Sequence, residues 1–145
     1  MDRPLKGRGV TDAHGTATWL MENGTEPECI ISSPAVRALH TAMIFARTFS
    51  IDFSAIRIEP GLYENGTTAY LKSAQQIDDA FSVAMIFGHN PSITSFINQC
   101  VDNAVSHVPT TGVACLSFAV DSWKDIPSGA KLIFFDYPKR RKTDK

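Results

Sequence analysis

Two segments of the sequence combine a helix start with a side chain that can bind an anion. In the first, the apolar run 29–31 leads into Ser33-Pro34, and Arg37 follows three residues later. Ser is a preferred N-cap residue and Pro a preferred first residue of a helix, so we expect a helix to begin here. The N–H groups at such a helix start attract anions. A guanidinium beside them suits a bidentate contact with phosphate.

The second segment, Gly88-His89-Asn90-Pro91, repeats this arrangement after the apolar run 83–87. An imidazole at the end of a strand, just before a helix, can donate a hydrogen bond to a phosphoryl oxygen. Taken singly, Arg37 suits a surface ion pair and His89 suits a structural role in a turn. Together they predict a phosphate-like anion site with Arg37 and His89 at its centre and Ser33 and Asn90 as further substrate contacts.

The apolar pattern places both segments in a chain of alternating strands and helices. We expect strands over 29–31, 56–58, 83–87, 113–120 and 131–137, and helices over 11–22, from 33–34 onward, over 68–79 and from 90–91 onward. The continuous apolar run 83–87 is typical of a central parallel strand covered on both faces. The last two strands have no helix between them. The pattern predicts a three-layer α/β/α sandwich with a mixed, mostly parallel sheet, in which ligands bind beyond the carboxyl ends of the strands.

Length and composition indicate one folded domain, residues 1–137, followed by a basic tail, residues 138–145. The chain has 145 residues, 43% of them hydrophobic and 20% charged, which excludes disordered and collagen-like chains. The tail holds five of the fourteen basic residues and one of the fifteen acidic ones, leaving the domain with nine basic and fourteen acidic groups, a net charge of −5. An acidic domain of this kind is a poor nucleic-acid binder, and we expect the tail to be solvated and frayed.

The cysteine pattern and the absence of long apolar runs indicate the cellular compartment of the protein. Three cysteines without a CxxC spacing favour neither a disulfide framework nor a zinc site. No run approaches the roughly 18 to 20 apolar residues of a membrane span, and the first residues do not resemble a signal peptide. We therefore expect a cytoplasmic protein that has no zinc site and binds neither membranes nor nucleic acid.

Five short motifs occur in an order that resembles a known family. They are Asp2-Arg3-Pro4-Leu5 with Arg8-Gly9, Ser32-Ser33-Pro34-Ala35 with Arg37-Ala38 and Thr41-Ala42, Leu62-Tyr63, Gly88-His89-Asn90-Pro91, and Pro109-Thr110-Thr111-Gly112. Together they resemble the phosphohistidine phosphatase (SixA-type) branch of the histidine phosphatase superfamily, whose fold is phosphoglycerate mutase-like. The resemblance extends over nearly the whole chain.

The resemblance implies a phosphatase that forms a phosphohistidine intermediate without a metal and acts on phosphorylated histidine of signalling proteins, or on small phosphate esters. It implies that Arg37 binds the phosphoryl group and that His89 is the second active-site histidine. It adds Arg3 as a further anion ligand and Glu64, shortly after Leu62-Tyr63, as a candidate proton donor.

One family feature is not found in this sequence. Members begin with a strand ending in Arg-His-Gly or Arg-His-Ala, whose histidine is the nucleophile, and the sequence given starts at the following Arg-Pro-Leu motif. The triplet around His14 comes after that motif and within a predicted helix, so we do not expect it to replace the nucleophile. We do not expect His40 or His107 to replace the nucleophile either. We expect the natural protein to carry the strand upstream, and a gap beside strand 83–87 in the chain as given.

Two other interpretations of the sequence remain open. The protein can be a non-catalytic pseudo-phosphatase that binds phosphate or a phosphoprotein through Arg37 and His89. It can also be a component of an assembly in which another chain supplies the missing strand. Under the phosphatase interpretation too, the 145-residue chain as given is expected to bind phosphate weakly and to turn over nothing.

Overall fold

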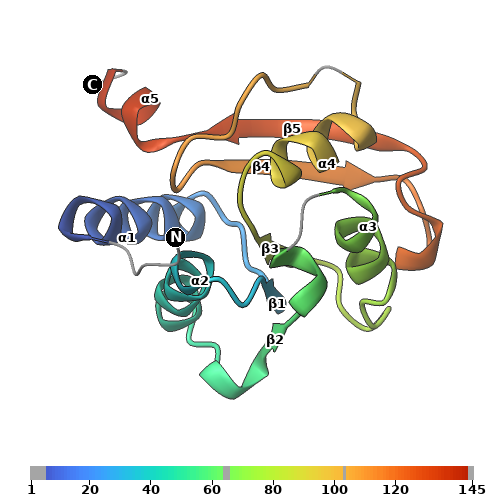
Figure 1. Cartoon of the computed structure of the whole chain (residues 1–145), viewed down its shortest axis with the longest axis horizontal. Helices are drawn as coiled ribbons and strands as arrows, with labels where there is room; N and C mark the ends of the chain where they lie inside the picture. Colours follow the sequence, from blue (N-terminus) through green and yellow to red (C-terminus); the bar gives the residue numbers. More distant parts are fainter. Residues whose placement is uncertain (1–5, 64–65, 103, 144–145) are drawn as a thin grey trace.

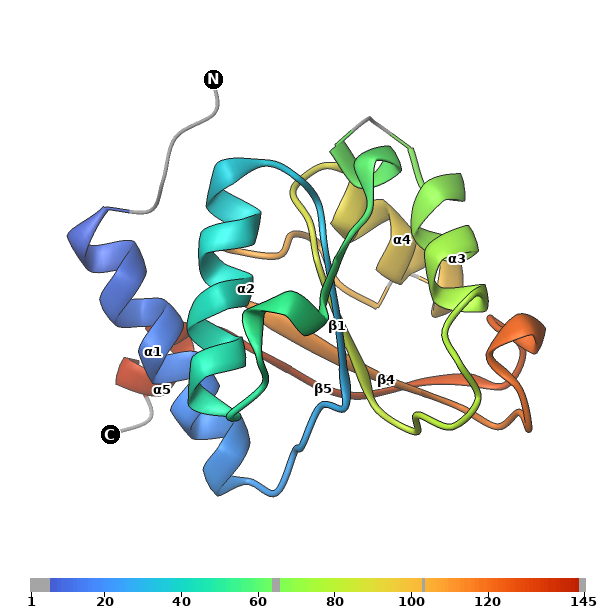
Figure 2. The same cartoon turned by 90° about the horizontal axis from the view of Figure 1, so that it is seen from below.

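The computed structural model describes residues 6–63, 66–102 and 104–143, and its strands lie between two groups of helices (Figures 1 and 2). The helices are α1 (Gly7–Glu22), α2 (Val36–Thr48), α3 (Thr68–Gln75), α4 (Ser92–Cys100) and α5 (Pro138–Thr143). The strands are β1 (Cys29–Ser32), β2 (Ile56–Ile58), β3 (Ala84–Phe87), β4 (Val113–Phe118) and β5 (Ala130–Asp136). Within these ranges no helix is long and apolar enough to span a bilayer.

Three of the strands form a parallel sheet in the order β2-β1-β3. Ile30 of β1 pairs with Ile56 on one side and with Met85 on the other, and Ile30 and Ile31 are fully buried. The parallel arrangement of the three predicted strands is confirmed. The prediction that strand 83–87 is central in this sheet is wrong, because β1 takes that position and β3 lies at the edge.

The last two strands form a separate antiparallel hairpin. Their register runs from Val113 opposite Asp136 to Phe118 opposite Ala130. Among the described residues, no strand joins β3 to β4, so the expected mixed sheet is divided here into a parallel sheet and a hairpin. The gap that we expected beside strand 83–87 is therefore confirmed. A cavity lies between β3 and β4 at this gap.

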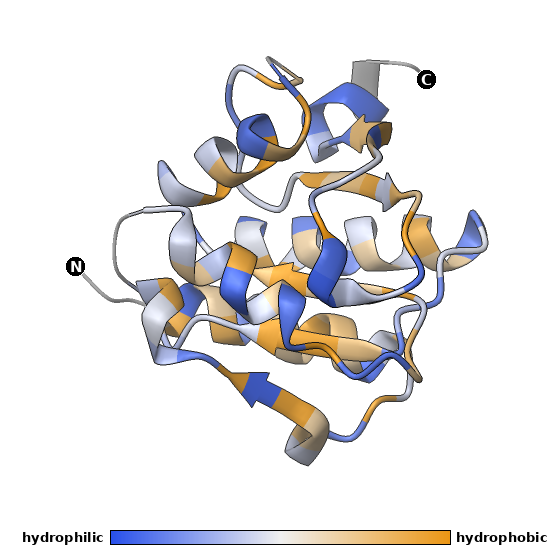
Figure 3. Cartoon of the chain, turned by 90° about the vertical axis from the view of Figure 1, so that its right-hand side faces the viewer, coloured by the Kyte–Doolittle hydropathy of each residue, from blue (hydrophilic) through white to orange (hydrophobic). Residues whose placement is uncertain are grey.

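Helices cover both sides of the strands, so the layers of the expected sandwich are present (Figure 2). On one side, α1 and α2 bury Leu20 and Phe45 against Phe87 of β3 and Phe134 of β5. On the other side, Tyr70 of α3 and Phe96 of α4 stack with ring centroids 5.6 Å apart. In Figure 3 the strands in the middle of the molecule are coloured mostly hydrophobic, whereas the helices alternate between hydrophobic and hydrophilic stretches. The fold is an α/β fold with a parallel three-stranded sheet and a hairpin.

The expectation of a frayed basic tail is not met for residues 138–143, which form helix α5 beside α1. The carboxylate of Asp136, whose side chain is 1% exposed, accepts hydrogen bonds from the guanidinium groups of Arg140 and Arg141. Arg141 also donates to the Thr16 hydroxyl at 2.7 Å. A buried carboxylate needs cationic partners, and here the tail supplies them.

Candidate anion-binding site

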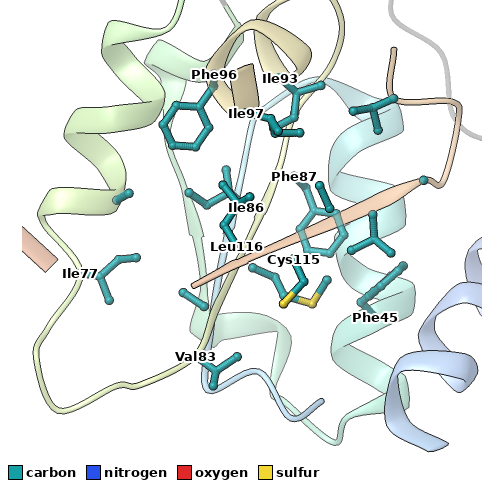
Figure 4. A pocket seen from close by; sticks show the side chains of 18 of the residues that line it. Phe45, Ile77, Val83, Ile86, Phe87, Ile93, Phe96, Ile97, Cys115 and Leu116 are labelled. Atoms are coloured by element: carbon teal, nitrogen blue, oxygen red, sulfur yellow. The ribbon is translucent and has the colours of Figure 1, made fainter. Parts of the chain in front are cut away.

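A cavity of about 1100 Å³ lies between β3 and β4; we call it the central cavity. Apolar side chains from β3, β4, α2 and α4 line most of it, and they converge on its interior in Figure 4. Polar residues line it as well, among them Arg37, His89, Asn90 and Thr111. The structure therefore brings together three of the residues that the sequence predicted for the anion site, namely Arg37, His89 and Asn90.

Arg37 lies in the first turn of α2, which begins at Val36 and not at Pro34. The start is later because the Ser33 hydroxyl accepts a hydrogen bond from the Ala35 N–H at 3.1 Å and holds residues 33–35 in a turn. The Arg37 side chain is exposed and forms no ion pair with another described residue. Because the first turn of α2 also contains no acidic residue, the dipole and the guanidinium both present positive charge to the cavity.

His89 follows β3, where its backbone and its ring are both held in place. The His89 N–H donates to the hydroxyl of the fully buried Tyr70 at 3.3 Å, and Tyr63 packs edge-on against the imidazole with ring centroids 5.9 Å apart. Within the described part of the chain, Nε2 of His89 is buried and has no hydrogen-bond partner. A buried polar atom without a partner is costly, and a bound oxyanion would satisfy it.

Thr111 is a residue that the sequence did not single out as part of the site. Its backbone has a φ of 57°, in the left-handed region that non-glycine residues rarely adopt. Its carbonyl accepts a hydrogen bond from the Thr16 hydroxyl at 3.1 Å, which fixes this loop to α1. Its own Oγ1 is buried and has no partner among the described residues. A signal for this position was present in the sequence, because Thr111 belongs to the fifth of the five motifs.

Nε2 of His89 and Oγ1 of Thr111, both buried and without a partner among the described residues, distinguish this site from the rest of the protein. In the described ranges, buried side-chain polar atoms without a partner occur on three residues, and His89 and Thr111, which line the central cavity, are two of them. The third is Nε of Arg57, on β2. Combined with Arg37, which has no ion-pair partner in the described part of the chain, the arrangement can bind a tetrahedral oxyanion through a charge-assisted contact and two neutral donors.

The structure gives Ser33 and Asn90 mainly structural contacts. Ser33 is fully buried in the turn before α2 and does not line the central cavity. Asn90 does line it, but its side-chain amide donates to the Val108 carbonyl at 2.8 Å and its side-chain oxygen accepts from the Thr94 hydroxyl. Asn90 thereby ties the start of α4 to the loop that leads to Thr111.

The remaining predicted residues lie elsewhere. Arg3 and Glu64 are outside the described residues. His14 is exposed on α1 and does not line the central cavity. His107 lines it but is exposed on the loop before Thr111. Among the described side chains, no three His, Cys, Asp or Glu residues come close enough together to hold a metal ion.

A thiol also lines the central cavity, that of Cys115. Burial raises the pKa of the Cys115 and Cys29 thiols, and it raises that of Cys100 to about 11. Since the thiolate is the reactive form, we expect Cys100 in the folded protein to react about a hundredfold more slowly at pH 8 than in urea. The rate of modification by a chromogenic disulfide in the two conditions measures this. Equal rates would contradict it.

The same shift has a consequence for stability at high pH. The unfolded thiol of Cys100 ionises near 9.0, whereas the folded thiol keeps its proton until about pH 11. The contribution to stability is therefore complete below pH 9 and declines as the pH rises from 9 to 11. Urea unfolding of the wild type and of Cys100→Ser across this range should show a smaller decline in the variant.

Gly88, between β3 and His89, has no room for a side chain. A Cβ at this position would lie 2.0 Å from the Tyr70 hydroxyl oxygen, and Tyr70 is fully buried against Phe96. We expect Gly88→Ala to lower the free energy of unfolding by about 1–3 kcal/mol, because the overpacked tyrosine cannot move aside. Urea denaturation checks this.

The control is Gly15→Ala. A Cβ on Gly15, in α1, would meet no atom within 4 Å, so this variant should stabilise the protein by about 0.5–1 kcal/mol. If both variants shift stability in the same direction, the packing argument at Gly88 is wrong.

The fold and the site together define an α/β protein with a candidate oxyanion site beyond the carboxyl ends of β1 and β3. The profile of the Histidine phosphatase superfamily (branch 1) matches residues 1–80. The chain belongs to this superfamily. This confirms the resemblance inferred from the five motifs.

The chain is also similar in sequence and in structure to individual known proteins. The chain is 27% identical over 148 residues to an uncharacterized protein of Mycobacterium leprae, which covers 95% of this chain and 88% of the relative. Its structure is similar to that of a SixA-type protein of Agrobacterium tumefaciens, with a TM-score of 0.73, 26% identity, and coverage of 94% and 87% of the two chains. It also shares the fold of the protein histidine phosphatase SixA complexed with tungstate, with a TM-score of 0.79, 18% identity, and coverage of 97% and 89%.

Proposed function

We propose that the protein acts as a phosphohistidine phosphatase, removing phosphate from phosphorylated histidine of a signalling protein through a phosphohistidine intermediate. The observation that carries the proposal is the placement of Arg37, His89 and Thr111 on one cavity, with Nε2 and Oγ1 buried and unpaired. These groups would hold the phosphoryl oxygens. The SixA protein of the same fold that is complexed with tungstate, an oxyanion, adds support.

The residues have distinct roles in this proposal. Arg37 would neutralise the charge of the phosphoryl group, and His89 and Thr111 would donate to its equatorial oxygens. Tyr70 and Tyr63 hold the His89 ring and backbone, so both are positioning residues. The nucleophile would be the histidine that the resemblance places on an upstream strand. The reaction is tested by measuring release of phosphate from a phosphohistidine-containing protein.

A second candidate function is a non-catalytic phosphate-binding protein. One observation favours it for the chain as given. His14 is exposed on α1 and away from the central cavity, so it cannot attack a phosphoryl group bound at Arg37 and His89. The two functions share the anion site and differ in turnover.

The shared anion site leads to a prediction for Arg37. We expect Arg37→Ala to weaken binding of inorganic phosphate about 10- to 100-fold, because a hydrogen bond to a charged group contributes about 1.5–3 kcal/mol. Isothermal titration at low ionic strength measures the change. Arg47→Ala is the matched control, since Arg47 lies in the last turn of the same helix and packs over Phe53. Equal loss of affinity in both variants would count against the site.

A further inference from the structure

Two consecutive hydrogen bonds link the carboxyl-terminal helix to the loop of the anion site. Nη2 of Arg141 donates to Oγ1 of Thr16 at 2.7 Å, and the Thr16 hydroxyl donates to the Thr111 carbonyl at 3.1 Å. These residues come from α5, from α1 and from the loop before β4, and α5 lies against α1 in Figure 2. We call Arg141, Thr16 and Thr111 the relay. It ends at a residue whose own Oγ1 is buried without a partner in the described part of the protein.

Each bond of the relay can run in one direction only. A guanidinium only donates and a carbonyl oxygen only accepts, so the Thr16 hydroxyl must accept from Arg141 and give its single hydrogen to Thr111. A threonine inside a helix often donates to the carbonyl four residues earlier, as Thr11 of the same helix does to Gly7 at 3.1 Å. Arg141 occupies an acceptor position of Thr16 and leaves its hydrogen for Thr111. A bond accepted by a hydroxyl also strengthens the bond that it donates.

The Arg141 side chain is itself held from three sides. Its guanidinium binds the buried carboxylate of Asp136, and it also donates to Thr16. The guanidinium carbon lies 5.8 Å from the centre of the Trp19 ring, and only 16% of the side chain is exposed. Because hydrogen bonds with a charged donor are stronger than neutral ones, the Thr16 hydroxyl is well anchored.

Thr111 needs such an anchor because its backbone conformation is unfavourable. The Gly112 N–H donates to the Pro109 carbonyl at 2.8 Å, which closes a turn with Thr111 as its third residue. The φ of 57° at this position suits glycine or asparagine, and a β-branched threonine rarely adopts it. The bond from Thr16 to the Thr111 carbonyl restrains this conformation and, with it, the position of Oγ1.

We propose that Arg141 is a positioning residue of the anion site. Acting through the Thr16 hydroxyl, it keeps Thr111 in the conformation that leaves Oγ1 unpaired at the central cavity. The inference rests on the proposed function, in which Thr111 donates to a phosphoryl oxygen. It gives the basic tail a role in phosphate binding, although Arg141 is not among the described residues that line the cavity.

Isosteric variants of the two threonines test the relay. Thr16→Val removes the bridging hydroxyl and Thr111→Val removes the donor itself, and each should weaken binding of inorganic phosphate about three- to tenfold. The double variant should bind no more weakly than either single variant, because both changes remove the same contact. Thr16→Ser keeps the hydroxyl and should restore the wild-type affinity. The control is Thr48→Val, which removes a hydroxyl bonded to Ile44 at 3.0 Å within α2 and should leave the affinity unchanged.

The tail is tested by changing each of the two arginines that bind Asp136. Arg141→Met removes the donor to Thr16 but keeps a long side chain against Trp19, and should weaken phosphate binding as much as Thr16→Val does. Arg140→Ala removes a cation from the same carboxylate and leaves the relay in place, so the affinity should stay unchanged. Urea denaturation first establishes that each variant is folded, and the Thr16 variants decide the question if Arg141→Met is not.

A second measurement needs no phosphate. The chemical shifts of the Thr111 N–H and methyl groups should change in Thr16→Val and return in Thr16→Ser. Unchanged shifts would overturn the proposal, as would additive losses of affinity in the double variant. If Thr111→Val weakens binding and Thr16→Val does not, Thr111 stays in the site and the relay is overturned. If the shifts change but neither Arg37→Ala nor Thr111→Val alters phosphate binding, the proposed function is contradicted, while the hold of Thr16 on Thr111 is supported.

Discussion

Replacing Asp136 by alanine is expected to lower the free energy of unfolding by about 3–5 kcal/mol, the cost of leaving a buried charge without its partner. Asp136 is 1% exposed at the end of β5 and accepts hydrogen bonds from Arg140 and Arg141. The Arg141 side chain is only 16% exposed, so its guanidinium would keep a hydrogen bond to Thr16 and contact with Trp19 but no counter-charge. Urea denaturation measures the loss.

Two further variants separate charge burial from simple loss of contacts. Arg140→Ala removes the other cation, which is 48% exposed, and should cost no more than about 1 kcal/mol because water screens the pair. The double variant Asp136→Ala/Arg141→Leu should be more stable than Asp136→Ala alone, because it removes the uncompensated charge. If Asp136→Ala is no less stable than Arg140→Ala, the buried charge of Arg141 is not what makes Asp136 important.

Helix α5 shows what sequence patterns cannot reveal about this tail. Four consecutive basic residues, 139–142, are typical of a solvated terminus. Whether these residues form a helix on the domain depends on contacts with two other residues. One is Asp136, only three residues before the run, and the other is Thr16, more than a hundred residues away in the chain. The sequence shows the cations but not that a strand buries a carboxylate next to them.

The strands were predictable because each is a short apolar run with a turn residue after it. Residues 29–31 and 56–58 correspond to β1 and β2 almost residue for residue. The pairing of the strands was harder to predict from the sequence. The order β2-β1-β3 and the separation of β4 from β3 depend on contacts between distant segments. A continuous apolar run such as 83–87 indicates burial on both faces and does not show whether both edges are paired.

At the candidate site, the sequence identified the residues that follow strands but not those that hold them. Arg37 and His89 were found because each is next to a helix start. Tyr70 was not, because nothing in residues 68–79 indicates that its hydroxyl would reach the His89 N–H at 3.3 Å. Thr111 was named only as part of a motif, since a positive φ and an unpaired Oγ1 are visible only in three dimensions.

The second prediction concerns the role of His89 in catalysis. Its expected effect on the rate is similar, as a free energy, to the effect of Asp136→Ala on stability. Hydrolysis through a phosphohistidine requires an unprotonated imidazole in line with the phosphorus and donors for the three equatorial oxygens. His89 lies three residues before the start of α4, where its Nε2 suits a donor to the phosphoryl group. The 145-residue chain should therefore bind phosphate without hydrolysing a phosphohistidine protein. A form extended by an apolar strand that ends in Arg-His should hydrolyse it.

In the extended form, His89→Ala should lower the rate of phosphate release by about 10²- to 10³-fold, which is typical of losing one donor to the transition state. Substitution of the added histidine should abolish release, because that residue would carry the phosphoryl group. His14→Ala is the control and should leave the rate unchanged, since His14 is exposed on α1 away from the cavity. Turnover by the 145-residue chain that is lost on His14→Ala would instead identify His14 as the nucleophile. Retention of full activity in His89→Ala would remove His89 from the catalytic site.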